Sequence, residues 1–435
     1  MERAPDGTNP VPLENEQPDD ARALTWRGLA LVGAIYAVVV SCYVVWRAER
    51  STDFRDFWET AVYFRQSGEI SSELGVHNYL PIFTLLMTPW SFLPLSVAIV
   101  LFTLLSLGLF AATVVMVEKL LCGALAKKPR PATLIAISLI LPYLYSCVTL
   151  GQLGLVLLFL LVAALRALQK RRDVLAGGLL GFALLLKVLP GALLIFCLLR
   201  GRFQAALSGF VLAAFVGLAM PMAMLGVDRT VKLHREFFQR VVEDGGVAAT
   251  LLKEKPIKAK YNNNAVPLVL RRLLSPVDGN PGNDPPIFAN VLNLPRPAIA
   301  TIYGLLIATA LGASVWFSTP RLRAMIGAGA GDDAVLFGAW CGLMLLLSPL
   351  VWTHYLVMMY WPVAYLVDRL ERGKGWRQRL CVAALLVWVV GAILLVWPSA
   401  RAAGAQIISV AALWVATLAL AGRTGREPGP VTSET

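Results

Sequence analysis

The chain has 435 residues, of which 57% are hydrophobic and only 15% are charged. Soluble globular domains carry about 25% charged residues, so this composition excludes a soluble protein and predicts a polytopic membrane protein. The net charge of +12 does not indicate nucleic-acid binding, because Lys and Arg form short clusters between apolar runs, which is typical of topology signals.

Two polar segments flank the apolar part of the chain. Residues 1–24 are rich in Pro, Asp, Glu and Asn and predict a disordered cytoplasmic tail, and residues 423–435 predict a second one. Six cysteines fall in or beside apolar runs without CxxC or Cys/His spacing: Cys42, Cys122, Cys147, Cys197, Cys341 and Cys381. This pattern predicts small core residues. We therefore expect no disulfide framework, no metal site and no cofactor.

Residues 25–422 contain a succession of apolar runs that predicts one all-α, multi-spanning membrane domain. The runs are 28–46, 95–117, 134–150, 154–168, 174–199, 203–225, 297–317, 334–350, 355–366, 381–397 and 405–420. The run 174–199 is long for one crossing and carries Lys187 and Pro190 in its middle. As a single crossing it would send every later basic cluster outside. We predict a helical hairpin that turns at 187–190, which gives about twelve transmembrane or re-entrant helices.

This arrangement obeys the positive-inside bias with both termini in the cytoplasm. The basic clusters 119–130, 166–172, 200–202, 321–323 and 369–379 become cytoplasmic. The outer face receives the first loop 47–94, the tip 149–152, the Lys187 turn, the long loop 226–296 and the segment 348–354. Loops above about 60 residues translocate largely regardless of their charge. The basic residues of the loop 226–296 are therefore compatible with its outer location. The polar residues within the apolar runs then all lie on the outer face.

The segment 53–65 of the first outer loop predicts an amphipathic helix. Its apolar residues recur at helical spacing, and Asp53 and Asp56 lie three apart on the other face. Such a helix lies on the membrane surface with its apolar side toward lipid. Asp53 is a candidate catalytic carboxylate with Asp56 beside it; alternatively, Asp53 is only the N-cap of this helix.

Three more polar residues are candidates for a site on the outer face. Placing a charged lysine in the lipid core costs about 2.5 to 3.5 kcal/mol of free energy. We therefore expect Lys187 to face an anion or a polar cavity; alternatively, its side chain extends to the membrane interface. Gln152 follows Gly151 at a helix tip, where it binds substrate or satisfies backbone groups. His354 begins a helix that re-enters the membrane, although a lone histidine is more often structural than catalytic.

A second amphipathic surface helix is predicted in the long outer loop, near residues 266–273. Asn262 and Asn264 precede it and suit hydrogen bonding to sugar hydroxyls or capping of the helix. Arg271 and Arg272 lie beside its apolar stripe. Carboxylates, a lysine, a histidine, a guanidinium pair and amides at a lipid boundary suit a phosphate-bearing lipid and a polyol acceptor.

An ordered set of short motifs runs from about residue 53 to 366. It consists of Asp53-Phe-x-x-Phe-Trp-x-x-Ala61, Asn78-Tyr79-Leu-Pro81, Gly151-Gln152-Leu-Gly, Ala176-Gly-Gly-Leu-Leu-Gly181, Lys187-x-x-Pro190, Asn264 before Arg271-Arg272, and Ser348-Pro349-x-x-Trp352-x-His354-Tyr. This set resembles glycosyltransferase family 87, the polyprenol-phosphate-mannose-dependent α-mannosyltransferases of the GT-C superfamily. The chain departs from the family pattern at Ile82 and Leu153, which leaves donor and acceptor identity open.

The resemblance implies a GT-C-type enzyme that moves a hexose, mannose in this family, from a polyprenyl-phosphate carrier to a cell-envelope glycolipid or glycan on the non-cytoplasmic face. Asp53 corresponds to the family's first-loop aspartate and would be the general base, with Asp56 as a helper. Binding of the donor phosphate or lipid is assigned to Lys187, His354, Arg271 and Arg272, and substrate binding to Tyr79, Gln152, Asn262 and Asn264.

The expected stereochemistry follows from the number of carboxylates. A sugar hydroxyl is a poor nucleophile at neutral pH, so a carboxylate must accept its proton as the anomeric bond breaks. With Asp53 in this role, the resemblance implies inversion. Retention would need a second carboxylate at the anomeric centre, for which Asp56 is the nearby candidate.

Other classes are compatible with a polytopic chain. A transporter or flippase would move a lipid-linked sugar without chemistry, but transporters commonly show interrupted helices in corresponding positions of two halves, and the hairpin 174–199 has no clear partner in the second half. A family member without activity would only scaffold envelope assembly. We expect a bacterial inner membrane protein whose partners are membrane lipid, the sugar donor and the acceptor, with no nucleic acid or protein partner.

Overall fold

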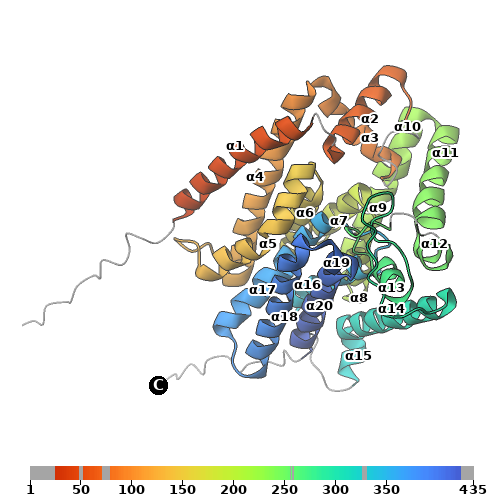
Figure 1. Ribbon diagram of the computed structural model, residues 1–435. Helices are drawn as coiled ribbons and strands as arrows, with labels where there is room; N and C mark the ends of the chain where they lie inside the picture. Colours follow the sequence, from red (N-terminus) through yellow and green to blue (C-terminus); the bar gives the residue numbers. More distant parts are fainter. Residues whose placement is uncertain are drawn as a thin grey trace, which may run out of the picture.

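The computed structural model describes residues 25–48, 52–70, 79–254, 256, 259–325 and 331–422. Within these ranges the chain forms helices and no β-strand (Figure 1). The predicted tails 1–24 and 423–435, and Asn78 of the second motif, lie outside the described residues. The described part is therefore all-α, as predicted.

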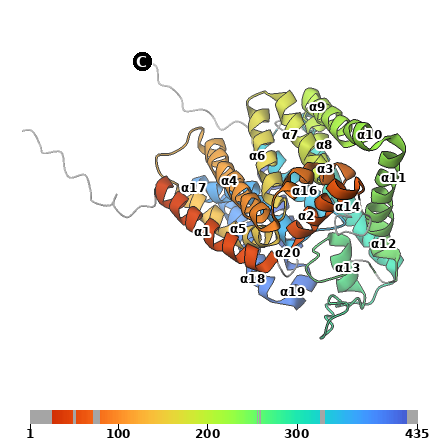
Figure 2. The same ribbon diagram turned by 90° about the horizontal axis from the view of Figure 1, so that it is seen from above.

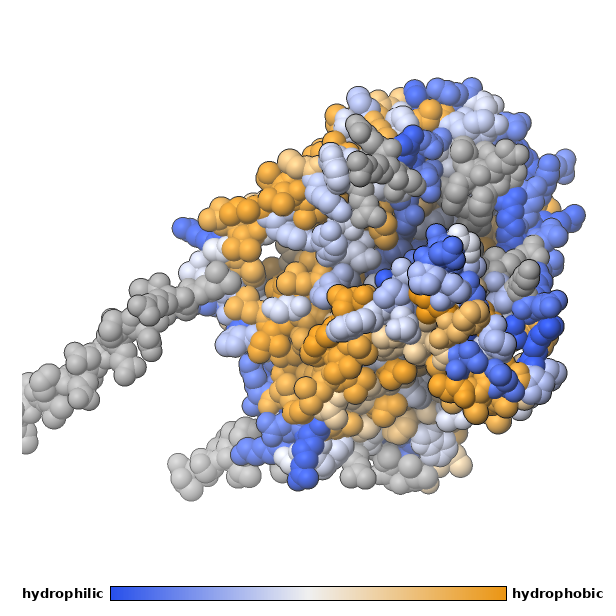
Figure 3. Space-filling model, in the orientation of Figure 1, coloured by the Kyte–Doolittle hydropathy of each residue, from blue (hydrophilic) through white to orange (hydrophobic). Residues whose placement is uncertain are grey.

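Six helical segments of the described chain are long and apolar enough to cross a membrane. They are α1 (Trp26–Ala48), α4 (Leu95–Cys122), α5 (Pro131–Leu150), α9 to α10 (Phe203–Leu225), α14 (Arg296–Ser318) and α18 with η6 (Trp376–Val396). Four shorter apolar helices accompany them: α6 (Gly154–Gln169), α7 (Asp173–Leu186), α16 (Asp333–Leu347) and α20 (Ala405–Ala421). Figure 3 shows apolar surface over α1 and the lower flank, with hydrophilic residues along the edges. The chain is a polytopic membrane protein, while the number of crossings stays a prediction.

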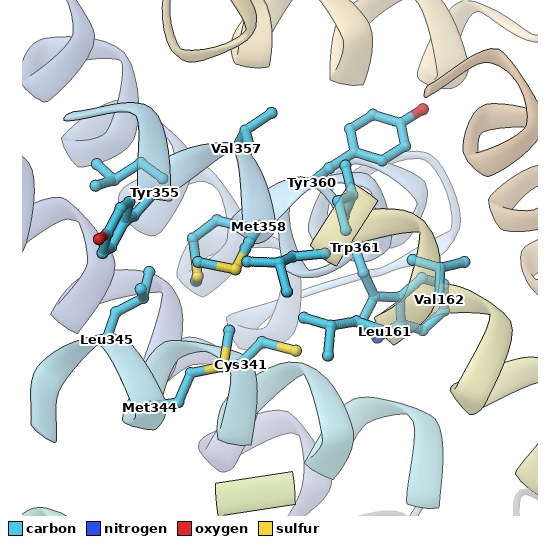
Figure 4. Close-up of a cluster of buried hydrophobic side chains, with 14 of the residues drawn as sticks. Leu161, Val162, Cys341, Met344, Leu345, Tyr355, Val357, Met358, Tyr360 and Trp361 are labelled. Atoms are coloured by element: carbon cyan, nitrogen blue, oxygen red, sulfur yellow. The ribbon is translucent and has the colours of Figure 1, made fainter. Parts of the chain in front are cut away.

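Short helices connect these segments: α2 (Asp53–Ser67), α3 (Pro81–Met87), η2 (Thr88–Phe92), α8 (Gly191–Leu199), α11 (Val227–Phe238), η4 (Gln239–Asp244), α12 (Val247–Leu252), α13 (Val266–Leu274), α15 (Pro320–Ala324), η5 (Thr353–Met359), α17 (Tyr360–Arg372) and α19 (Pro398–Ala402). The predicted span 355–366 falls on η5 and α17, which other helices enclose. In Figure 4, Met358 and Trp361 lie among buried residues of α6 and α16, and Tyr355 stands at the edge of this cluster. Buried apolar side chains thus surround the segment that carries His354.

Helices α7 and α9 run parallel in close contact. Asp173 at the start of α7 pairs with Arg202, just before α9, at 3.2 Å. A Cβ atom on Gly177 would overlap the backbone of Ala205, and one on Gly181 would overlap Gly209. Small residues let membrane helices approach this closely. Because α9 begins beside the start of α7, the intervening α8 runs back, and the chain reverses at Lys187.

The two ends of the bundle differ in their polar residues. Phe102 near the start of α4 packs on Phe54 with ring centroids 4.7 Å apart, and Glu118 near its end pairs with Arg130 at 2.7 Å. Glu118 lies sixteen positions after Phe102, which corresponds to about 24 Å along the helix. Asp333 pairs with Arg200 at the start of α16, and Thr353 follows the end of this helix. These two ion pairs therefore lie at one end of the bundle, and the candidate site residues lie at the other.

Candidate active site

A cavity of about 400 Å³ opens at the end of the bundle opposite the ion pairs of Glu118 and Asp333. Its lining comes from segments far apart in the sequence: Asp53, Asp56, Phe57, Tyr79, Ser146, Leu150, Gln152, Lys187, Asn262, Trp352, Thr353, His354, Tyr355 and Arg401. Ligand pockets commonly measure about 300 to 1,000 Å³, so the volume suits a small polar substrate group. In Figure 1, α2 lies in the upper part of the molecule and α19 lies below it, and Figure 1 and Figure 2 both show α19 near α13.

Asp53 is the first residue of α2 and leaves the capping role to Thr52. The Thr52 hydroxyl accepts a hydrogen bond from the amide of Arg55 at 3.4 Å. The Asp53 carboxylate is therefore available to the cavity, and the side-chain amide of Gln152 donates to it. Burial raises the pKa of Asp53, while the Gln152 hydrogen bond and the charge of Lys187 oppose that shift.

The apolar face of α2 is buried in the protein. Phe54 packs on Phe102, and Phe57 packs on Tyr79 and Phe83 with ring centroids 5.2 and 5.0 Å apart. Phe54 and Phe57 are at most 3% exposed. They therefore pack inside the protein, whereas the sequence predicted that they face lipid. This aromatic packing fixes the position of Asp53.

Gln152 is brought to Asp53 by a tight helix end. Gly151 closes α5 with φ +65°, a conformation that favours glycine, and a Cβ atom there would collide with Phe54. The Tyr79 hydroxyl donates to the Gln152 side-chain oxygen at 3.4 Å. Tyr79, Gln152 and Asp53 thus form one hydrogen-bonded chain, in which Gln152 orients the carboxylate.

Asp56 lines the same cavity one helical turn after Asp53. Burial raises the pKa of its carboxyl, and the negative charge of Asp53 raises it further. Its neighbour Arg55 pairs with Glu59 at 2.7 Å. The structure therefore brings two carboxylates to the cavity, with Asp53 the more deeply buried.

Lys187 points into the cavity from the turn after α7. Its ammonium group donates to the Tyr355 hydroxyl and lies 3.7 Å from the ring centroid of Tyr355 and 5.3 Å from that of Tyr79. Aromatic faces stabilise a cation at such distances. This placement differs from snorkelling toward the membrane surface.

His354 is 4% exposed, and its Nε2 atom has no hydrogen-bond partner among the described residues. Burial and the charge of Lys187 lower its pKa well below the usual range, which favours the neutral imidazole. A neutral ring with a proton on Nε2 can donate to an oxygen of a ligand in the cavity.

The asparagines of the long loop join it to the segment before η5. Asn263 and Trp352 form an antiparallel bridge, and the amide of Asn264 donates to the Val351 carbonyl at 2.6 Å. Only Asn262 of the two predicted asparagines lines the cavity, while Asn264 donates to the backbone of Asn262 at 3.2 Å.

Arg271 and Arg272 are not among the residues that line the cavity, and their role in donor binding stays a prediction. Arg272 is wholly buried and donates to the carbonyls of Lys260 and Asn263 at 2.9 and 2.8 Å. Arg271 donates to the carbonyls of Lys253 and Glu254 at 3.3 and 3.2 Å. Both side chains therefore hold the loop that carries Asn262.

Arg401 lines the cavity and was missed by the sequence reasoning. It lies on α19, the short connection between the last two apolar runs, which the predicted topology places outside. A basic residue in a short outer connection opposes the positive-inside bias. This exception to the positive-inside bias is the sequence feature from which Arg401 could have been predicted. Tyr355 and Thr353, which contact Lys187 and Arg401, carried no separate signal.

Comparison with known families decides the classification. The model of glycosyltransferase family 87 matches residues 77–349 of the chain. The chain belongs to glycosyltransferase family 87. The part of the chain that matches the family includes Tyr79, Gln152 and Lys187, and the fold brings Asp53 and His354, which lie outside it, to the same cavity. Searches of curated proteins and of solved structures gave no match.

Membership of family 87 makes this chain a membrane glycosyltransferase. The cavity holds the side chains that sugar transfer requires: a carboxylate that can accept a proton, and cationic or neutral donors that can face a leaving group. No group of three or more His, Cys, Asp or Glu suited to a metal ion is present in the described ranges.

Proposed function

We propose that this family 87 enzyme transfers a hexose, mannose in the first instance, from a polyprenyl-phosphate carrier to a hydroxyl of a cell-envelope glycolipid or glycan. The observation that carries the proposal is the joint placement of Asp53, Lys187 and His354 around one cavity. A base for the acceptor and donors for a phosphate are the two requirements of this reaction.

In the proposed reaction, Asp53 accepts the proton of the acceptor hydroxyl as its oxygen attacks the anomeric carbon. The Gln152 amide orients the carboxylate, since it donates to it directly. The bond between the anomeric carbon and the phosphate oxygen breaks, and the polyprenyl phosphate leaves with that electron pair. Lys187 and His354 stabilise the negative charge that develops on it.

Inversion is the outcome that this geometry supports. Asp53 alone is held by a side-chain amide and is the more buried of the two carboxyls. A single displacement needs only this base, whereas retention requires Asp56 to attack the anomeric carbon first. NMR of the product linkage distinguishes the two, and retention of the donor configuration would contradict the proposal.

We also propose a bacterial inner membrane location with the cavity on the non-cytoplasmic side and a GT-C-type architecture. The support is the clustering of basic residues at the opposite end of the bundle, which the positive-inside bias places in the cytoplasm. In a cysteine-depleted background, a cysteine at Val188 should label from outside and one at Lys170 only from the cytoplasm. Labelling of both from the same side would contradict this orientation.

The reaction is tested with purified protein in lipid, polyprenyl-phosphate-[14C]mannose and an envelope lipid extract. A labelled glycolipid supports the proposal. Movement of the labelled donor between leaflets without any product would indicate the flippase instead.

A further inference from the structure

Two buried nitrogen atoms at the cavity lack an acceptor. They are Nε2 of His354 and Nε of Arg401, and neither has a hydrogen-bond partner in the part of the chain that the structure describes. A buried donor without a partner costs about 1 to 3 kcal/mol, so two of them beside one cavity indicate a ligand that accepts hydrogen bonds.

Arg401 is held in place from two sides. Its Nη2 atom donates to the Thr353 hydroxyl at 3.3 Å, and its guanidinium carbon lies 4.8 Å from the ring centroid of Tyr261. Thr353 directly precedes His354 in η5, so the two nitrogen atoms without acceptors belong to neighbouring positions in the wall. A guanidinium group that is fixed by stacking on a ring, and that has an N–H group without an acceptor, is preorganised to bind phosphate oxygens.

The charge on this side of the cavity is also uncompensated. Arg401 and the buried Arg272 have no ion pair with a carboxylate among the described residues, and each is partly or wholly buried. Burial lowers the pKa of Arg401 and that of Arg272, and the charge of Arg401 lowers the pKa of Arg272 further. An anion next to Arg401 would relieve both effects.

We propose that Arg401 binds the phosphate of the prenyl-linked donor together with His354. This inference rests on the proposed function, and it assigns to the donor a residue outside the stretch that matches the family. The donor is the favoured source of the phosphate because Arg401 neighbours His354, whereas the acceptor hydroxyl must lie at Asp53.

The experiment measures binding without turnover, in vesicles of phosphatidylcholine, which is zwitterionic and carries no net charge. Farnesyl phosphate is the probe, and farnesol is the uncharged match with the same chain. The variants are Arg401→Gln, Arg401→Lys and the exposed control Arg235→Ala on α11. Arg401→Gln keeps a side chain that can bond Thr353, and a melting curve for each variant shows whether it is folded.

Arg401→Gln should bind farnesyl phosphate about 10 to 100 times more weakly than the wild type, the range expected for one charge-assisted hydrogen bond. Arg401→Lys should lose less, and farnesol binding and Arg235→Ala should be unchanged. Equal affinity of wild type and Arg401→Gln for farnesyl phosphate would overturn the proposal, as would a wild type that binds farnesol as tightly as farnesyl phosphate.

Kinetics separate the two possible sources of the phosphate. A higher KM for the donor in Arg401→Gln, with the acceptor KM unchanged, supports the assignment. A higher KM for the acceptor alone would overturn it and place an acidic group of the acceptor at Arg401. If the wild type binds farnesyl phosphate through Arg401 but transfers no sugar, the proposed function fails while the binding role of Arg401 stands.

Discussion

The side-chain amide of Gln152 donates a hydrogen bond to the carboxylate of Asp53, 99 positions earlier in the chain. This contact joins the end of α5 to the start of α2, and Tyr79 extends it through the Gln152 oxygen. Because an amide that donates to a carboxylate favours its charged form, Gln152 keeps Asp53 ready to accept a proton despite its burial.

The first prediction concerns the pH dependence of transfer. Gln152→Met removes the donor, so the pKa of Asp53 should rise and the acidic limb of the kcat/KM profile should move to higher pH. Activity at neutral pH should fall about tenfold or more, as expected for a lost charge-assisted hydrogen bond. Tyr79→Phe, which removes only the 3.4 Å contact to Gln152, should shift the limb less. An unchanged profile in Gln152→Met would show that Gln152 does not tune the base.

The second prediction concerns stability. Burial raises the pKa of Asp53 above its ordinary value of 3.8, so the folded state binds this proton more tightly than the unfolded state. Ionisation of Asp53 therefore destabilises the fold as pH rises from 3.8 through the folded pKa. Asp53→Asn should melt at a higher temperature than the wild type at pH 7, and the difference should vanish at low pH. A lower melting temperature of the variant at pH 7 would mean that the ionised carboxylate stabilises the fold.

The third prediction concerns Lys187. Lys187→Gln removes the positive charge near the proposed phosphate, so the donor KM should rise about tenfold or more while the acceptor KM changes little. Tyr355→Phe keeps the ring beside the ammonium and removes only the hydroxyl, so it should have a smaller effect. Steady-state kinetics with each substrate varied in turn measures both. Equal donor KM values in Lys187→Gln and the wild type would remove Lys187 from the phosphate site.

The fourth prediction concerns the loop that carries Asn262. Arg272→Met leaves the carbonyls of Lys260 and Asn263 without their buried donor, so unfolding should cost about 3 kcal/mol less. Activity should fall with it, because the loop lines the cavity. Arg296→Met, which changes an exposed arginine at the start of α14, is the control. If Arg272→Met is as stable as the wild type but loses donor binding, Arg272 binds the donor, as the sequence predicts, and does not stabilise the loop.

The sequence predicted the features that depend on local pattern. Apolar runs located the membrane helices, and Lys187 with Pro190 marked the break between α7 and α8. Asp53, Gln152 and His354 were selected as polar exceptions in an apolar chain, and all three line the cavity.

The remaining features depend on tertiary contacts that no local pattern encodes. The apolar face of α2 packs on protein because α3 and α4 lie under it, which spacing alone cannot distinguish from lipid. The hydrogen bonds of Arg271 and Arg272 to backbone carbonyls of the same long loop could not be read from the sequence either, and their role in donor binding stays a prediction. Arg401 was missed because a single arginine between two spans forms no motif.

The central claim is that Asp53 is the base for sugar transfer. The most direct measurement is single-turnover transfer from labelled polyprenyl-phosphate-mannose by wild type, Asp53→Asn and the control Asp228→Asn, an exposed carboxyl on α11. We expect Asp53→Asn to bind the donor like the wild type and to transfer at least a thousandfold more slowly, on the order of the loss of a general base, and Asp228→Asn to remain active. Transfer by Asp53→Asn within a few-fold of the wild-type rate would contradict the account.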